Sequence, residues 1–420
     1  MKNDPVVVFL IRSVSHYMAP ARRYDVRVTN LFSDEMRRNP YPLYAQMREK
    51  SPVFYVPPPF DAWMIFDYQT VKWALNDHAT FSSRVPAPDW FIFSDPPSHT
   101  KLRGLISQAF TPRMVANLEL RIRELSRALL TKTAERGEMD LVADYSIPLP
   151  MMVIAEMIGI PSEDWSRFNH WSDAIVRISQ ARSGGEEAAA ASAGFREVTV
   201  EMTAYLVGMV EQRQAAPKDD LLTRLVAAEV DGERLTEREI LGFFQLLIVG
   251  GQETTTNLIS NAMLCLMENP EQRELLERRM DLLPLAIEEV LRYRSPLQWM
   301  LRKPTRDIEA HGKVIPAGKL TIPVMGSANR DPNVFPQADR FDITRDPNPH
   351  VAFGHGIHFC LGASLARLEA RVALTDLFER VRKFEPASDE PWTPRDAFHV
   401  HGPKSLPIRF EPCTMRSAPA

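Results

Sequence analysis

The apolar positions of this chain recur mainly at the spacing of α-helices. The strongest pattern begins at Thr236, which forms a capping box with Glu239, and continues to about Glu268, just before Asn269-Pro270. At 1.5 Å per residue this helix is roughly 48 Å long, which is enough to cross a whole domain. Further helices are predicted over residues 111–136, 151–158 and 361–382, of which the first two end before glycines.

Two parts of the chain favour β-structure. Phe54–Val56 and Trp63–Phe66 flank a run of three prolines, which predicts a hairpin, and the chain after residue 300 is β-like and rich in proline. Residues 183–194 are a low-complexity stretch that predicts a mobile connection between two helices, because helical patterns resume on both sides. No repeat and no domain boundary interrupts residues 31–420, so we expect one domain there, preceded by an extension over residues 1–30.

Composition excludes several classes of protein. The 420 residues are 45% hydrophobic and 25% charged, which excludes a disordered chain. A net charge of −4 argues against a nucleic-acid-binding protein. The apolar run Val6 to Ile11 is too short to span a membrane, which takes about 20 residues, and it lacks the cleavage site of a signal peptide. We therefore expect a cytoplasmic protein without membrane or nucleic-acid partners.

The most informative segment is residues 353–362, where two glycines precede Cys360 and a third follows it, all next to a helical run. A cysteine just before a helix N-terminus is favoured as a thiolate, which makes Cys360 a plausible soft metal ligand. A buried, inert cysteine is the alternative. Cys265 lies in an apolar helical stretch, so we expect it in the core. Cys413 lies near the tail, so we expect a free thiol.

Residues 353–362 resemble the haem-binding loop of the cytochrome P-450 superfamily, the haem-thiolate monooxygenases. The family pattern is Phe, Gly, any, Gly, any, His or Arg, any, Cys, any, Gly, and every fixed position is matched. The resemblance implies iron protoporphyrin IX (haem b) as the cofactor and Cys360 as its thiolate ligand, with Phe353 and Gly354 in the cofactor-binding loop. It covers the chain from about Asn39 to Glu411.

A second segment, Gly250-Gly251-Gln252-Glu253-Thr254, lies inside the long helix. Each glycine in a helix interior costs about 1 kcal/mol relative to alanine. Either a packing-driven kink or a groove beside reactive polar groups would explain that cost. The segment resembles the family's distal helix motif, which implies that Glu253 and Thr254 are the catalytic acid–alcohol pair that delivers protons during oxygen activation. Thr255 and Thr256 are expected to bond to the preceding turn or to water.

Glu289 and Arg292 share one helix face at i,i+3, which on any helix is usually a solvated pair. They match the family's Glu-x-x-Arg, and Arg340 matches the third member of its buried charge network, a structural role. By the same resemblance, the residues expected to contact the haem propionates are His99, Arg103, Arg302 and His358. Taken alone, His99 and Arg103 at i,i+4 only indicate one face of an amphipathic helix.

The fold implied by the resemblance is mainly α with a small β-rich lobe, with haem between the long helix and the Cys360 loop. The implied activity is hydroxylation, with dioxygen, of an apolar molecule such as a fatty acid, steroid, terpenoid or polyketide. No flavin or iron–sulfur module is readable, so electrons would come from a ferredoxin or flavodoxin with an NAD(P)H-dependent reductase. We expect a monomer. A peroxide-driven peroxygenase and a non-catalytic haem-binding protein are the rival hypotheses.

The expected substrate pocket is mostly apolar, although any one of its aromatic residues could equally be a core residue. Arg84 or Arg182 could anchor a carboxylate at its edge. The predicted lining residues are Trp90, Phe91, Leu246, Val249, Gly250, Trp299, Met300 and Val400.

Overall fold

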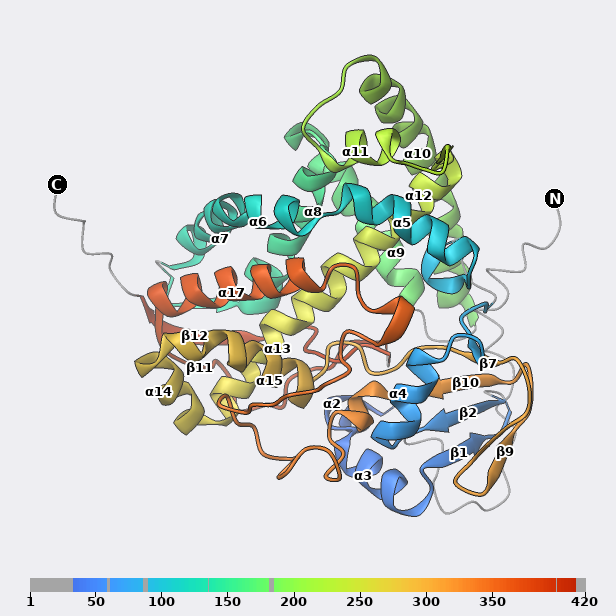
Figure 1. Ribbon diagram of the computed structural model, residues 1–420. Coiled ribbons are helices and arrows are strands. Elements are labelled where there is room, and N and C mark those ends of the chain that lie inside the picture. The colour runs from blue at the N-terminus through green and yellow to red at the C-terminus, as the bar shows by residue number, and fades with distance from the viewer. Residues whose placement is uncertain are drawn as a thin grey trace.

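The computed structural model describes residues 33–58, 61–85, 90–134, 136–180, 185–397 and 399–412. A large helical part adjoins a smaller lobe that carries β1, β2 and β10 (Figure 1), as the resemblance implied. The α-helices are α2 (Asp34–Arg38), α3 (Tyr41–Lys50), α4 (Tyr68–Asn76), α5 (Ser98–Ala109), α6 (Pro112–Asn117), α7 (Glu119–Ala134), α8 (Pro148–Ile158), α9 (Trp165–Gln180), α10 (Gly185–Ala215), α11 (Leu221–Ala227), α12 (Glu237–Leu247), α13 (Thr254–Glu268), α14 (Pro270–Arg278), α15 (Leu283–Tyr293), α16 (Met325–Ala328) and α17 (Ala363–Arg380).

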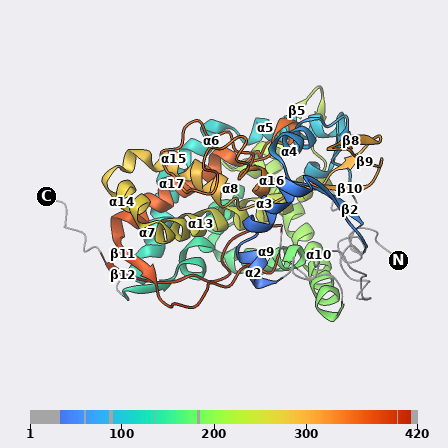
Figure 2. The same ribbon diagram turned by 90° about the horizontal axis from the view of Figure 1, so that it is seen from below.

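The strands form small, separate sheets. The predicted hairpin is confirmed as β1 paired antiparallel with β2, and β10 adds to β2 in parallel. A second sheet, in the order β11-β12-β4, lies at the opposite end of the molecule in both views (Figures 1 and 2). The strands are β1 (Val53–Val56), β2 (Ala62–Ile65), β3 (Phe81–Ser82), β4 (Glu138–Asp140), β5 (Glu229–Val230), β6 (Glu233–Arg234), β7 (Lys303–Pro304), β8 (Ile308–Ala310), β9 (Lys313–Ile315), β10 (Leu320–Pro323), β11 (Val381–Pro386) and β12 (Pro407–Pro412).

The predicted long helix is confirmed, with one internal irregularity. The capping box of Thr236 and Glu239 is present in both directions, and the helix ends at Glu268 before the predicted Asn-Pro stop. Between α12 and α13 the backbone winds as a π-helix over Ile248–Glu253. A π-segment inside a helix often marks a functional site, and this one coincides with the glycine pair.

α13 runs through the middle of the molecule in both views (Figures 1 and 2). Its residues from Thr255 to Leu266 are buried on every side, polar ones included. Thr256 Oγ1 donates to the Ser146 carbonyl at 2.9 Å, and Asn261 Nδ2 donates to the carbonyls of Arg294 and His401 at 3.0 and 2.9 Å. Buried polar groups are stable only with such partners. α13 therefore makes both apolar contacts and hydrogen bonds in the core.

Two of the other predicted helices and one predicted connection differ from the structure in their limits. The helix expected over residues 111–136 is two helices, α6 and α7, because the Leu118 amide bonds to the Val115 carbonyl at i−3 and tightens the turn. α8 begins three residues before the predicted Met151 and ends as expected at Gly159, with φ +90°. The connection expected over residues 183–194 was wrong in part, since α10 already begins at Gly185. No helix in the described ranges is long and apolar enough to cross a membrane.

Candidate active site

The Cys360 loop is a tight turn that leads into α17. Gly354 and Gly356 have φ of +72° and +69°, a region that favours glycine. A Cβ at Gly356 would lie 3.0 Å from the Asn76 Cα, so the loop also packs closely on α4. The Cys360 amide donates to the Phe353 carbonyl at 2.8 Å and closes the turn. This backbone geometry places the cysteine three residues before α17 begins.

The Cys360 side chain has an unusual set of neighbours. Cys360 and Phe359 are both exposed, yet the surrounding protein raises the pKa of the thiol by desolvation. A thiol that solvent can reach but that is set back among other protein groups is both exposed and partly desolvated. The Gly362 amide and the guanidinium groups of Arg103 and Arg367 act in the opposite direction and lower that pKa. An accessible thiol beside cationic and amide groups is where a thiolate ligand is stabilised.

Histidine and arginine donors gather beside this loop. The rings of His99 and His358 lie with centroids 4.2 Å apart. His99 Nε2 and His358 Nδ1 are buried without a hydrogen-bond partner. Burial, helped by the nearby arginine charges, lowers the pKa of His99 to about 4 and that of His358 to about 3, so both rings are neutral at pH 7.

The two arginines of this group have no acidic partner among the described residues. Arg103 donates to the Phe359 carbonyl at 2.7 Å, and Arg302 to the adjacent Leu301 carbonyl at 2.8 Å. Burial lowers the pKa of Arg302 to about 10, opposed by the charge of Asp95. An uncompensated buried guanidinium costs several kcal/mol. The four side chains therefore favour an anionic group beside Cys360.

The glycine pair in the central helix separates into two roles. Gly250 is exposed, and an added Cβ would meet no atom within 4 Å. An added Cβ at Gly251 would lie 2.6 Å from Ile154 Cδ1, on α8. Gly251 supports the packing hypothesis, because it lets the helix pack on α8. Gly250 faces open space.

Glu253 and Thr254 follow directly at the end of the π-segment. Glu253 is buried, while Thr254 is half-buried. Thr254 Oγ1 donates to the Gly250 carbonyl at 2.5 Å. The sequence predicted such a bond to the preceding turn, or to water, for Thr255 and Thr256 instead. For Thr256 that prediction was wrong, because its Oγ1 donates to the Ser146 carbonyl at 2.9 Å. A threonine hydroxyl has one hydrogen to donate and two lone pairs, so Thr254 keeps its capacity to accept a hydrogen bond.

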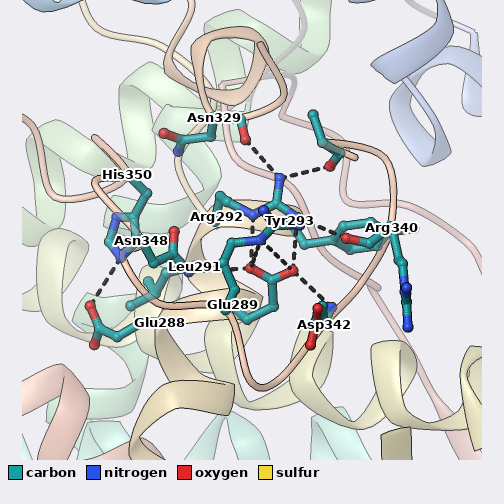
Figure 3. Close-up of polar contacts among 12 residues, drawn as sticks. Glu288, Glu289, Leu291, Arg292, Tyr293, Asn329, Arg340, Asp342, Asn348 and His350 are labelled. Atoms are coloured by element: carbon teal, nitrogen blue, oxygen red, sulfur yellow. Dashed lines mark hydrogen bonds and ion pairs between the residues drawn. The ribbon is translucent and has the colours of Figure 1, made fainter. Parts of the chain in front are cut away.

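Glu289 and Arg292 form a fully buried ion pair on α15 rather than a solvated one (Figure 3). Arg292 Nε and Nη2 donate to the two Glu289 oxygens, both at 2.8 Å. The remaining N–H groups of Arg292 reach backbone carbonyls, namely those of Asn329 at 3.0 Å, Ala338 at 2.7 Å and Arg340 at 3.0 Å. The pair thereby ties α15 to the loop that leads toward Cys360.

The prediction that the Arg340 side chain is the third member of this network was wrong. Arg340 is exposed, and its side chain leads away from the pair (Figure 3), so that it contributes only its carbonyl. Arg345 takes the place instead, with Nε 3.2 Å from Glu289 Oε2. The loop carries no helical or strand period, so its tertiary path decides which arginine turns inward.

Comparisons with known proteins agree with this geometry. A family model for cytochrome P450 matches residues 190–406. The chain is 41% identical over 382 residues to the putative cytochrome P450 YjiB of Bacillus subtilis, covering 89% of this chain and 94% of that protein. The chain belongs to the cytochrome P450 family. This cytochrome P450 is also 36% identical over 401 residues to the vitamin D(3) 25-hydroxylase of Pseudonocardia autotrophica, covering 91% of this chain and 96% of the relative.

A solved structure supports the same placement. CYP109E1 from Bacillus megaterium, solved in complex with corticosterone, matches this cytochrome P450 with a TM-score of 0.84 and 39% sequence identity. The match covers 90% of this chain and 100% of that chain. The protein is therefore a cytochrome P450 monooxygenase, and the family implies a haem cofactor.

The residues around Cys360 fit a haem group. Haem carries an iron that a thiolate can ligate and two carboxylates that cationic and neutral N–H donors can bind. Cys360 supplies an accessible sulfur. His99 and His358 offer buried nitrogens without a partner, and Arg103 and Arg302 offer guanidinium groups without an acid. These are the residues that would hold the cofactor.

The structure distributes the predicted pocket residues over several places. Phe91 is a core residue, 6.3 Å from the Phe243 ring centroid, so the core alternative holds for it. Trp90 donates its Nε1 hydrogen to Gln245 Oε1 on α12 at 3.2 Å. Trp299 and Val400 line a cavity of about 80 Å³ beside α2 and α3.

The remaining residues predicted for the pocket lie on the central helix, in the β-lobe and at the surface. Leu246 and Val249 are half-buried on the central helix near Gly250, and Met300 packs against the core of the β-lobe. Arg84 is exposed and lies 3.7 Å from Asp95. Arg182 and Cys413 lie outside the described residues, as does the predicted extension over residues 1–30.

The two glycines offer a matched pair of substitutions. Gly250→Ala should raise the free energy of unfolding by about 1 kcal/mol, because alanine is the better helix former and the methyl group meets no atom. Gly251→Ala should lower it by roughly 1–3 kcal/mol, because Ile154 is itself fully packed and cannot yield freely. Thermal unfolding of the two variants measures this difference. Equal stability of both variants would contradict the separate roles.

Proposed function

We propose that this cytochrome P450 hydroxylates an apolar substrate, using Glu253 and Thr254 to control protons at the reaction centre. The observation that carries this proposal is the open space at Gly250, next to a buried acid and a hydroxyl with free lone pairs. When bound, haem b would supply the activation of dioxygen and the insertion of one oxygen atom into the substrate. The protein supplies position, a proton path and the exclusion of water.

Thr254 and Glu253 have separate roles in this proposal. The Thr254 hydroxyl, whose hydrogen is engaged by the Gly250 carbonyl, accepts a hydrogen bond and so holds a water molecule or protonated oxygen in place. The Glu253 carboxylate links that point to protons from bulk solvent. A general acid or base requires a continuous path at hydrogen-bond distances. A sequence in which an acid directly precedes the threonine favours such a path.

The substrate class is proposed as apolar, with steroids before fatty acids, terpenoids and polyketides. Leu246 and Val249 are half-buried apolar residues within one helical turn of Gly250. One relative is named a vitamin D(3) 25-hydroxylase, and one similar structure holds corticosterone. An apolar lining with few polar groups favours shape and hydrophobic contact over charge in substrate selection. Titration of steroids against the purified enzyme, followed by the low-spin to high-spin shift, tests the class.

The electrons are proposed to come from a separate ferredoxin or flavodoxin with an NAD(P)H-dependent reductase, in the cytoplasm. A peroxide-driven peroxygenase on the same fold is the second candidate. The acid–alcohol pair at Glu253 and Thr254 favours the first, because a peroxygenase receives its oxygen already reduced and needs no proton delivery from such a pair. Turnover with NADPH and a surrogate ferredoxin system, compared with turnover on peroxide alone, distinguishes the two.

Substitutions of the pair should fail in two different ways. Thr254→Ala should still consume NADPH and dioxygen but release peroxide instead of hydroxylated product, because the acceptor that holds the protonated oxygen is lost. Glu253→Gln should slow NADPH consumption itself, because an amide cannot relay a proton. The measurement is product formed per NADPH consumed at saturating substrate, together with the rate of consumption.

Thr254→Ser is the matched control, since it keeps the hydroxyl and should stay close to wild type in coupling. All three variants should keep the spectrum of the thiolate complex with CO, because none touches Cys360. If Thr254→Ala couples as well as wild type, the role proposed for Thr254 is wrong and another donor, such as ordered water, takes its place.

A further inference from the structure

A loop formed by residues 393–397 and 399–404 lies directly against one face of α13. Gly402 approaches so closely that an added Cβ would lie 2.5 Å from Asn257 Oδ1. The His401 carbonyl accepts from Asn261 Nδ2 at 2.9 Å, one turn further along the helix. The His401 amide donates to the Pro296 carbonyl at 2.8 Å, which fixes the loop from its other side. The loop is therefore held rigidly on the face of the helix that carries Asn257.

Arg395 belongs to this loop and reaches the same helix face. Only 9% of Arg395 is exposed, and its Nε donates to Asn257 Oδ1 at 2.9 Å. Asn257 is four residues after Glu253, so the two share a helix face. Arg395 Nη2 and Asn257 Nδ2 are both buried without a hydrogen-bond partner. Two unpartnered donors next to each other indicate that an acceptor belongs between them.

Glu253 is the acid whose charge acts on this loop. Burial lowers the pKa of Arg395, and the charges of Glu253 and Asp396 oppose that shift. Burial also lowers the pKa of His399, again opposed by Glu253, so the His399 ring is neutral at pH 7 and adds no cation. Arginine stays protonated in proteins. Arg395 is thus a buried cation within electrostatic range of Glu253, and its hydrogen bond to Asn257 places it on the same helix face.

We propose that Arg395 is the positioning residue for Glu253, which holds the carboxylate by charge and through Asn257 in the orientation needed for proton delivery. The inference rests on the proposed role of Glu253. A buried carboxylate is costly unless a cation lies near it, and Arg395 is a buried cation on the same side of the helix. Arg395 lies 142 residues after Glu253 in the sequence. Its hydrogen bond to Asn257 couples its position to the helix that carries Glu253.

The test compares Arg395→Gln with Arg395→Lys in the holoenzyme. The glutamine variant keeps a hydrogen-bonding side chain but removes the charge, and the lysine variant keeps the charge. With NADPH and a surrogate ferredoxin system, Arg395→Gln should lower turnover by about tenfold, part of the roughly hundredfold that a positioned proton donor contributes. It should also raise the H₂O/D₂O solvent isotope effect on turnover. Arg395→Lys should recover most of the rate.

Arg37→Met is the matched control. Arg37 donates to the Arg395 carbonyl and pairs with Asp34, so its loss loosens the same loop and leaves the Arg395 guanidinium in place. Its turnover and isotope effect should stay at wild-type values. If Arg395→Gln does not yield holoenzyme, Arg395→Met replaces it, because an apolar side chain of similar length tolerates burial better.

A double variant distinguishes this inference from the proposed function. If Arg395 acts through Glu253, then Glu253→Gln with Arg395→Gln should turn over no more slowly than Glu253→Gln alone. Independent, multiplying losses would overturn the inference, as would a wild-type rate and isotope effect in Arg395→Gln when Glu253→Gln is slow. A wild-type rate in Glu253→Gln would instead overturn the proposed function of Glu253, and this inference with it.

Discussion

Cys360→His should abolish monooxygenase turnover and remove the strongly red-shifted Soret band of the reduced CO complex, while it leaves haem binding possible. That band would require a thiolate ligand from Cys360, and imidazole cannot donate charge to iron as a thiolate does. The histidine and arginine donors beside the loop remain in place and can still hold the propionates. The absorption spectrum of the reduced, CO-treated protein measures this directly.

The other cysteines are the controls. Cys265 is fully buried in α13, where burial raises the pKa of its thiol to about 12 and keeps it neutral. Cys265→Ala and Cys413→Ala should both keep the red-shifted band. A normal imidazole-like band in fresh wild-type protein would contradict the assignment of Cys360.

Arg292→Ala should give mostly haem-free or insoluble protein. The substitution leaves the Glu289 carboxylate buried with Arg345 as its remaining cation, and removes the donors of three loop carbonyls. Breaking a buried pair by removing one partner costs about 3–5 kcal/mol, a large part of the stability of most proteins. Yield of soluble holoprotein and the unfolding midpoint are the measurements.

Arg340→Ala provides a sharp control for this result. Because Arg340 contributes only its carbonyl, the variant should express and bind haem close to wild type. Arg345→Ala should lose less stability than Arg292→Ala but should still be clearly destabilised, because Arg345 is one of two cations that contact Glu289. Equal damage from Arg340→Ala and Arg292→Ala would contradict the network as the structure shows it.

Local signals predicted much of the scaffold correctly. The capping box at Thr236 and the Asn-Pro stop after Glu268 determined the ends of the long helix, because both act within a few residues. The break at Leu118 was not predictable, since the apolar pattern is the same for one helix and for two consecutive helices. The π-segment at the glycine pair was only indicated, because periodicity does not distinguish a wide turn from a kink.

The candidate site was predictable where neighbouring residues carry it, and not where distant ones do. The loop around Cys360 and the Glu253-Thr254 pair are short segments, readable in the sequence by themselves. Arg345 in place of Arg340, and Arg395 beside Asn257, were missed because no spacing along the chain relates them. A buried charge selects its partner through space, and the loops that carry these arginines have no period of their own.

The sequence by itself determined the family and the main helix, and it located the candidate thiolate loop and the candidate acid–alcohol pair, since each is set by residues only a few positions apart. The tertiary structure alone decided which glycine faces open space and which packs on Ile154, which arginine completes the Glu289 pair, and that a loop near the C-terminus meets the central helix at Asn257. Burial and counter-charge depend on everything that surrounds a side chain. That surrounding exists only after residues more than a hundred positions apart have packed together.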